Sequence, residues 1–128
     1  MTTSNRKAPL RFSKILIVAG ALVASTAAHA ALLTSGPLKM SPADDYFCGA
    51  VNLGSKDIAV DISVTISGSV PGSGATESCP ALAKDVVCEA VNEAGGFSYR
   101  SCKITTSSKK ATKGTFCNTT KNICIPVE

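Results

Sequence analysis

The sequence contains no tryptophan and only one histidine, His29. Triad hydrolases use a histidine as the general base that activates their serine or cysteine nucleophile. Histidine is also a common zinc ligand and a frequent acid or base in catalysis. Because His29 lies in a segment that we expect to be removed, we expect a protein that is not an enzyme and that uses no cofactor or metal.

Only one long hydrophobic run is present, and it lies near the start of the chain. A basic stretch of fourteen residues precedes the apolar residues 15–24, and Ala28-His29-Ala30 follows with small residues at its first and third positions. This order is typical of a secretory signal peptide. We therefore interpret residues 1–30 as a signal peptide that is cleaved after Ala30, and we expect a secreted or periplasmic protein.

The alternative to cleavage is an anchor that remains in the membrane. Residues 15–33 are nearly long enough to cross a bilayer. Ser25, Thr26 and His29 interrupt this stretch, and the small-residue signal lies inside it. We therefore favour cleavage, after which no later segment is long and apolar enough to span a membrane.

Excess positive charge is absent from the rest of the chain. The sequence has 13 lysines and arginines against 9 acids, but four of the cations are Arg6, Lys7, Arg11 and Lys14. From Ala31 onward the cations and acids balance, whereas nucleic-acid binding requires a basic domain. We therefore expect no nucleic-acid partner.

The exported part contains all six cysteines and no Cys-x2-Cys spacing of the kind that zinc sites use. An even number of cysteines in a short exported chain predicts disulfides. Close spacing favours Cys79–Cys88 and Cys117–Cys124, which leaves Cys48–Cys102 as the long-range bond. In the chain-entropy picture, the long loop contributes about 4 kcal/mol and each short loop about 2.5 kcal/mol.

Alternating hydrophobic residues predict the strands. Ile58, Val60, Ile62, Val64 and Ile66 alternate with small or polar residues, which predicts a strand with one buried face. Further short strands are expected at 46–52, 97–106, 115–117 and 124–127. The Gly/Pro/Ser-rich segment 67–75 is expected to form a turn or loop. Short strands separated by turns predict an all-β fold, a small antiparallel immunoglobulin-like β-sandwich, over residues 46–128. Residues 31–45, which contain two prolines, are interpreted as a flexible leader.

Residues 79–92 are ambiguous. Pro80 and several good helix formers favour a helix, whereas Val86, Val87 and Val91 favour strands. Residues nine apart in a helix lie about 13.5 Å apart along its axis, and a disulfide needs Cα atoms within about 7 Å. A helix through both cysteines and a Cys79–Cys88 bond therefore exclude each other, and we favour a β-hairpin.

Several short motifs resemble a group of small exported bacterial proteins. They are Phe47-Cys48, Val51-Asn52-x-Gly54, Ile58-x-Val60-x-Ile62, Cys102-Lys-Ile-Thr105, Ser108-Lys-Lys110 and Gly114-Thr-Phe-Cys117. The Cys79…Cys88 pair also fits, although the group usually has Pro-Gly at the turn where this chain has Ala83-Lys84-Asp85. The resemblance covers roughly residues 46–124. It implies a disulfide-bonded β-sandwich without an established function, and it carries over no catalytic residues.

Charge is unevenly distributed along the exported part. Residues 31–93 hold three cations and eight acids, whereas residues 94–128 hold six cations and one acid. The candidate residues for binding an anionic surface or a partner are Arg100, Lys103, Lys109, Lys110 and Lys113, with Lys121 as a further cation. The alternative is that the two halves neutralise each other across the sandwich, with lysines protecting edge strands.

These observations favour an exported, non-enzymatic structural or binding module. Its partner would be an envelope or extracellular protein, or an anionic surface. The alternative is a secreted protease inhibitor or toxin-like effector that presents the basic loop 106–114, in which Lys109 or Lys110 would enter the specificity pocket of a trypsin-like protease.

The signal-peptide interpretation predicts that the exported protein begins at Ala31. N-terminal sequencing of protein recovered from outside the cytoplasm measures this directly. Protein that stays in the membrane fraction with Met1 intact would contradict cleavage and would place the domain on a membrane tether.

Overall fold

The computed structural model describes residues 29–67 and 74–128, and these residues form nine β-strands and no helix. The predicted signal peptide lies outside the described residues, except for its last two positions. Most of the Gly/Pro/Ser-rich segment 67–75 also lies outside them. No helix that would cross a membrane occurs in the described part of the chain.

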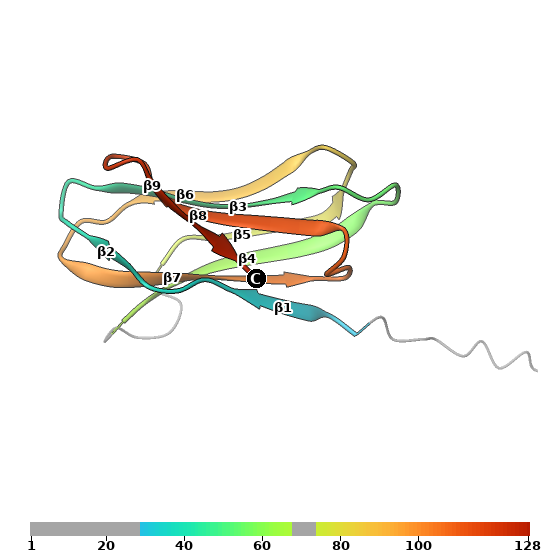
Figure 1. Ribbon diagram of the computed structural model, residues 1–128, viewed down its shortest axis with the longest axis horizontal. Helices are drawn as coiled ribbons and strands as arrows, with labels where there is room; N and C mark the ends of the chain where they lie inside the picture. Colours follow the sequence, from blue (N-terminus) through green and yellow to red (C-terminus); the bar gives the residue numbers. More distant parts are fainter. Residues whose placement is uncertain (1–28, 68–73) are drawn as a thin grey trace, which may run out of the picture.

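The strands form two antiparallel sheets that stack as a sandwich, with one sheet above the other in Figure 1. The first sheet, which we call the β4 sheet, contains β1 (Ala31–Thr34), β2 (Leu38–Met40), β4 (Ile58–Ile66), β5 (Thr76–Leu82) and β7 (Ser98–Thr106). Its strand order is β1-β7-β4-β5, and β2 also pairs with β7. The β3 sheet has the order β6-β3-β8-β9 and contains β3 (Asp45–Asn52), β6 (Val87–Glu93), β8 (Thr112–Asn118) and β9 (Ile123–Val127). The predicted all-β antiparallel sandwich is confirmed.

Strand β4 follows its sequence pattern closely. Ile58, Val60, Ile62 and Val64 are buried between the sheets, and the alternate side chains point outward. Ile66, at the end of the strand, is only partly buried. The period-two pattern therefore identifies the inner face of the β4 sheet, apart from its last residue.

The three predicted disulfides are present. Cys48–Cys102 joins β3 to β7, and its Cα atoms are 6.2 Å apart. Cys79–Cys88 joins β5 to β6 with the same Cα separation, and Cys117–Cys124 joins the paired strands β8 and β9 at 4.1 Å. Two of the three bonds therefore connect one sheet to the other.

The expected hairpin at residues 79–92 is wrong in one respect. Both halves are strands, but β5 pairs with β4 and β6 pairs with β3, so the chain crosses from one sheet to the other between them. Asp85 has a positive φ of 61° in this crossing. The Asn52 side chain donates to the Leu82 carbonyl at 2.8 Å, and the Asp85 amide donates to the Asn52 carbonyl at 2.7 Å. These hydrogen bonds attach the crossing to the end of β3.

The expected flexible leader at 31–45 is also wrong. Both β1 and β2 pair with β7, so the sheet begins at Ala31. Leu33 and Met40 are buried in the core, and the segment that contains Gly36 and Pro37 forms the short link between the two strands. Burial of these two side chains is the reason that the segment is ordered, because apolar surface removed from water offsets the entropy of fixing the backbone.

The inner strands pair as in an immunoglobulin domain, while the terminal strands exchange sheets. In that fold, strand B pairs with E, C pairs with F, and a disulfide joins B to F across the sandwich. Here β3 pairs with β6, β4 pairs with β7, and Cys48–Cys102 joins β3 to β7. The difference is that β1 and β2 lie beside β7, and β8 lies beside β3.

One side of the sandwich is closed by the two ends of the domain. Ser35 forms a β-bridge with Val127, and Thr34 and Glu128 exchange two backbone hydrogen bonds. Strand β9 therefore runs from the β3 sheet toward β1, as Figure 1 shows. The opposite side is closed by the Cys79–Cys88 bond between β5 and β6.

Neighbouring residues of β4 give a matched test of this fold. Ile62 is 2% exposed, whereas Asp61 is exposed and accepts a hydrogen bond from Ser78 at the surface. We expect Ile62→Ala to lower the free energy of unfolding by about 2–5 kcal/mol and Asp61→Ala to change it by at most about 0.5 kcal/mol. Urea unfolding measures both values. Similar losses in the two variants would show that both faces of β4 are buried and would contradict this architecture.

Candidate functional site

Strand β3 carries apolar side chains on both of its faces. Tyr46, Cys48 and Ala50 point into the core and are buried. Phe47 and Val51 alternate with them and point outward, where they are only partly buried. Because the β4 sheet covers only the inner face, Phe47 and Val51 lie on the outer surface of the sandwich.

The strand register places more apolar side chains around these two. On β6, Val91 lies opposite Phe47 and Val87 lies opposite Val51. Their exposed fractions are 60% and 51%. We call the outer surface of this sheet the Phe47 face, and it comprises Asp45, Phe47, Gly49 and Val51 of β3, Val87, Glu89, Val91 and Glu93 of β6, and Lys113, Thr115 and Cys117 of β8.

The ring of Phe47 lies over Gly49, two residues along the same strand. A Cβ atom at residue 49 would collide with the ring. The glycine therefore allows the ring to lie against the sheet instead of projecting into solvent, an arrangement known from aromatic side chains that cover glycines in sheets. Gly49 therefore leaves the space that the Phe47 ring occupies on this surface.

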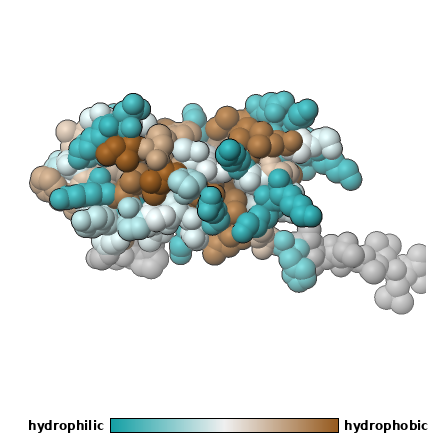
Figure 2. Space-filling model, viewed as in Figure 1, coloured by the Kyte–Doolittle hydropathy of each residue, from teal (hydrophilic) through white to brown (hydrophobic). Residues whose placement is uncertain are grey.

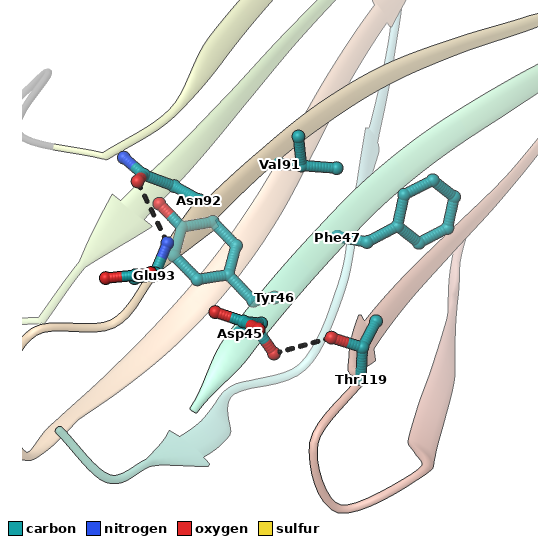
Figure 3. Close-up of a pocket in the computed structure, with 7 residues that line it drawn as sticks. All are labelled: Asp45, Tyr46, Phe47, Val91, Asn92, Glu93 and Thr119. Atoms are coloured by element: carbon teal, nitrogen blue, oxygen red, sulfur yellow. Dashed lines mark hydrogen bonds between the residues drawn. The ribbon is translucent and has the colours of Figure 1, made fainter. Parts of the chain in front are cut away.

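Two open hollows flank Phe47 on this face. One, of about 400 Å³, is lined by residues that include Asp45, Phe47, Val91 and Glu93. Figure 3 shows Phe47 and Val91 side by side, with the Thr119 hydroxyl near Asp45, to whose carbonyl it donates a hydrogen bond. The other hollow lies between Phe47, Val51, Val87 and Lys113. Apolar side chains of another molecule would fit into these two hollows.

The outer surface of the β4 sheet has a different chemistry. Asp61, Ser63 and Thr65 of β4 lie opposite Thr105, Lys103 and Ser101 of β7. These are small or polar side chains, and the Ser78 hydroxyl donates to Asp61 at 2.5 Å. The exposed Leu32 and Tyr99 also lie on this surface, but at separate positions along β7. On the Phe47 face, by contrast, apolar side chains of β3 and β6 lie side by side.

The space-filling view shows the exposed apolar surface. Hydrophobic residues gather in several patches, with hydrophilic side chains between them (Figure 2). Two of the patches lie in the upper half of the view, where Figure 1 places the β3 sheet. The exposed apolar surface in this view is divided into separate patches.

The cations that were candidates for an anion-binding or partner-binding surface are separated. Lys103 lies on the outer surface of the β4 sheet, and Lys113 lies on the Phe47 face. Lys109 and Lys110 are exposed in the turn between β7 and β8. Lys109 and Lys113 line a common hollow, beside Leu33, Pro126 and Glu128. A single continuous basic surface does not form.

Arg100 is not at the surface and therefore does not belong to such a site. It is 5% exposed, and its guanidinium carbon lies 4.6 Å from the centre of the Tyr46 ring. It also donates to the Ala94 carbonyl and to the Ser98 hydroxyl. The attraction of a cation to an aromatic face, with these hydrogen bonds, stabilises the buried charge. Arg100 is a structural residue at one end of the core.

Sequence reasoning missed a second buried charged residue, Asp44. Asp44 is 3% exposed, and its Oδ2 atom accepts hydrogen bonds from the Lys121 ammonium at 2.9 Å, the Asn118 amide at 2.8 Å and the Ser41 backbone N–H at 2.7 Å. The Lys121 hydrogen bond is the main reason that the pKa of Asp44 falls from 3.8 to about 2. Asp44 joins the segment before β3 to the turn between β8 and β9. Nothing in the local sequence distinguishes it from its exposed neighbour Asp45.

The Phe47 face was also missed, although a signal for it exists. Residues 46–51 form a continuous apolar run, which is typical of a strand with apolar side chains on both faces. The alternation Val87-x-Glu89-x-Val91 likewise places two valines on one side of β6. What the sequence does not show is that these valines point outward and lie beside Phe47.

Neither similarity to known proteins nor a cluster of metal ligands assigns a role to this surface. No protein-family model, no curated protein and no solved structure matches the chain. Within residues 29–67 and 74–128, no group of three or more histidine, cysteine or acidic side chains is placed to hold a metal ion. The Phe47 face is therefore a candidate functional site on the basis of its geometry alone.

Asp44 predicts a specific sensitivity to acid. Because its pKa is lower in the folded protein, its ionised form contributes stability at pH values above about 4, and this contribution is lost as the pH falls toward about 2. We expect the free energy of unfolding to fall less steeply over this range in Asp44→Asn than in the original protein, and Asp57→Asn, at an exposed acid, serves as the control. Urea unfolding at several pH values measures the slopes. The same slope in Asp44→Asn as in the original protein would contradict a role for Asp44.

Proposed function

We propose that this chain is an exported, non-enzymatic binding module and that it binds another protein through the Phe47 face. One observation carries the proposal. Val87 and Val91 are more than half exposed and lie on the same face as Phe47, whose ring lies over Gly49. Among the described residues, the exposed Leu32 and Tyr99 on the outer surface of the β4 sheet lie apart from each other, so the apolar cluster is particular to the Phe47 face.

Export agrees with the chemistry of the cysteines. All six are in disulfides, and none is free. Disulfides of this kind persist in oxidising compartments such as the periplasm or the extracellular space. The partner that we propose is therefore an envelope or extracellular protein.

A protein fits the Phe47 face better than a small molecule does. Small-molecule sites usually enclose most of the ligand in a concave cavity with a few converging polar groups. Here the hollows on either side of Phe47 are open, and their walls are strand side chains on an extended surface. Aromatic side chains near the centre of a flat surface, with charged residues at the rim, are typical of protein interfaces.

The inhibitor alternative has less support, because the basic loop is a compact turn. The Thr106 and Thr112 hydroxyl oxygens are 2.7 Å apart, and the Thr112 hydroxyl donates to the Ser108 carbonyl at 2.7 Å. The Thr112 amide donates to the Lys109 carbonyl. These bonds keep Lys109 and Lys110 in a tight connection between β7 and β8 instead of an extended segment that would add to a protease as a strand.

Site-specific photo-crosslinking tests the proposed surface. A photoreactive amino acid replaces Val91 on the Phe47 face or, as a matched control, Leu32 on the outer surface of the β4 sheet. The two side chains are 60% and 57% exposed. We expect irradiation of exporting cells to give protein adducts at position 91 and few at position 32. Equal yields at both positions, or none at position 91, would contradict the proposal.

A further inference from the structure

Strand β6 lies at the edge of the β3 sheet, and its pairing shows which of its backbone groups face outward. In an antiparallel ladder, every second residue exchanges hydrogen bonds with one neighbouring strand, and the residues between point their N–H and C=O groups away from it. At one end, the Ala94 amide donates to the Asp44 carbonyl, and at the other the Val86 carbonyl accepts from β3. The even-numbered residues of β6 therefore bond to β3. The outward-facing backbone groups belong to Val87, Glu89 and Val91.

These outward-facing groups have no strand beside them within residues 29–67 and 74–128. Strand β6 pairs with β3 alone in this part of the chain. The Cys79–Cys88 bond brings β5 close, but β5 belongs to the other sheet. The side chains of Val87, Glu89 and Val91 are exposed. Strand β6 thus offers a row of backbone donors and acceptors to which a further strand can add.

The other edges of the two sheets, so far as the structure describes them, are protected. Strands β1 and β9 cover each other through the bridge between Ser35 and Val127, and β2 has only three residues. Strand β5 contains Pro80, which has no N–H, and its register with β4 shifts. Short strands, prolines and irregular pairing all protect sheet edges. Val87–Glu93 contains neither proline nor lysine, so β6 is the edge that remains available.

The available edge is acidic. Strand β6 carries Glu89 and Glu93 and no cation. Residues 76–93, which form β5, the crossing and β6, hold four acids and one lysine. On the Phe47 face, Asp45 adds a further acid, and Lys113 lies on β8, which β3 separates from β6. Charge complementarity therefore favours a cationic partner at this edge.

A second copy of this chain fits the edge poorly. Pairing of β6 with another β6 would gather Glu89 and Glu93 of both copies in two neighbouring strands. No cation of Val87–Glu93 would compensate them. Like charges that face each other across strands are destabilising. The same glutamates that oppose self-pairing attract a strand that carries lysine or arginine.

We infer that β6 binds an extended, cationic segment of another exported protein as an additional antiparallel strand of the β3 sheet. The side chains of β6 on the Phe47 face alternate between valine and glutamate along Val87–Glu93. Opposite them, the added strand places apolar residues beside the valines and lysine or arginine beside the glutamates. Its sequence pattern is therefore Lys/Arg-x-apolar-x-Lys/Arg. This inference rests on the proposed function, because it specifies the chemistry of the partner that meets the Phe47 face.

The peptide Thr-Lys-Thr-Val-Thr-Lys-Thr-Val-Thr has this pattern and serves as the probe. We expect it to slow amide hydrogen exchange at Val87, Glu89 and Val91 of the exported protein about tenfold or more, because these amides then enter a ladder. N-methylation of its lysines and valines, whose N–H groups face β6 in antiparallel pairing, should abolish binding. N-methylation of its threonines should leave most of the binding intact. NMR spectroscopy measures the exchange and the affinity.

Charge exchange tests the selectivity of the edge. Glu89→Lys should weaken binding of the lysine peptide about tenfold, whereas Asp61→Lys, at an exposed acid on the opposite outer surface, should leave it nearly unchanged. The double variant Glu89→Lys/Glu93→Lys should instead bind the same peptide with glutamate in place of lysine. Binding of the glutamate peptide would also show that the double variant is folded.

Four results would overturn strand addition at β6. The first is no binding of the lysine peptide at millimolar concentration, and the second is binding that does not slow exchange at Val87, Glu89 and Val91. The third is equal or reversed binding of the two N-methylated peptides, which would show that antiparallel backbone pairing is absent. The fourth is equal affinity of the original protein for the lysine and glutamate peptides.

The crosslinking experiment at position 91 separates this inference from the proposed function. Adducts with another exported protein, together with failure of the lysine peptide, would overturn strand addition and leave the Phe47 face as a binding surface. An absence of adducts at position 91 would overturn the proposed function. Adducts that consist of two copies of this chain would overturn the cationic partner.

Discussion

The Cys48–Cys102 disulfide is the constraint on which the rest of the sandwich depends. It joins an inner strand of one sheet to an inner strand of the other, and both cysteines are fully buried. With Cys48 inside, the alternation of a β-strand requires Tyr46 and Ala50 to point inward and Phe47 and Val51 to point outward. The bond that holds the sheets together therefore also decides which side chains of β3 are presented to solvent.

Buried polar groups complete the ends of the core. Asn52 donates to the Lys56 and Leu82 carbonyls and accepts from the Gly54 amide, which holds the connection from β3 to β4. At the other end of β3, Asp44 binds Asn118 and Lys121. Among the described residues, no buried side-chain nitrogen or oxygen lacks a hydrogen-bond partner. Such groups are costly to bury when unpaired, so each of these networks requires one particular arrangement of the loops that carry it.

The proposed binding surface lies on a sheet and not on the loops. A partner that meets the Phe47 face meets side chains whose backbone is held by hydrogen bonds on both sides of β3. Gly49 lets the Phe47 ring lie against this backbone before binding. Surfaces that are already ordered lose less conformational entropy on association, which leaves more of the contact energy for affinity. Among the described residues, the outer surface of the β4 sheet is mostly polar, and its exposed Leu32 and Tyr99 lie apart from each other.

The sequence by itself determined the all-β class, the buried face of β4 and the pairing of the cysteines, because period-two alternation and short cysteine spacings are local signals. Only the tertiary structure decided that β5 and β6 belong to different sheets. It also decided that residues 31–45 form strands, with Leu33 and Met40 in the core, and that Arg100 and Asp44 are buried. It also brought Val91 beside Phe47 and separated Lys103 from Lys113. The physical reason is that a strand's pattern shows that its two faces differ, whereas its neighbours, and the face that is covered, depend on long-range pairing that leaves no trace in the local sequence.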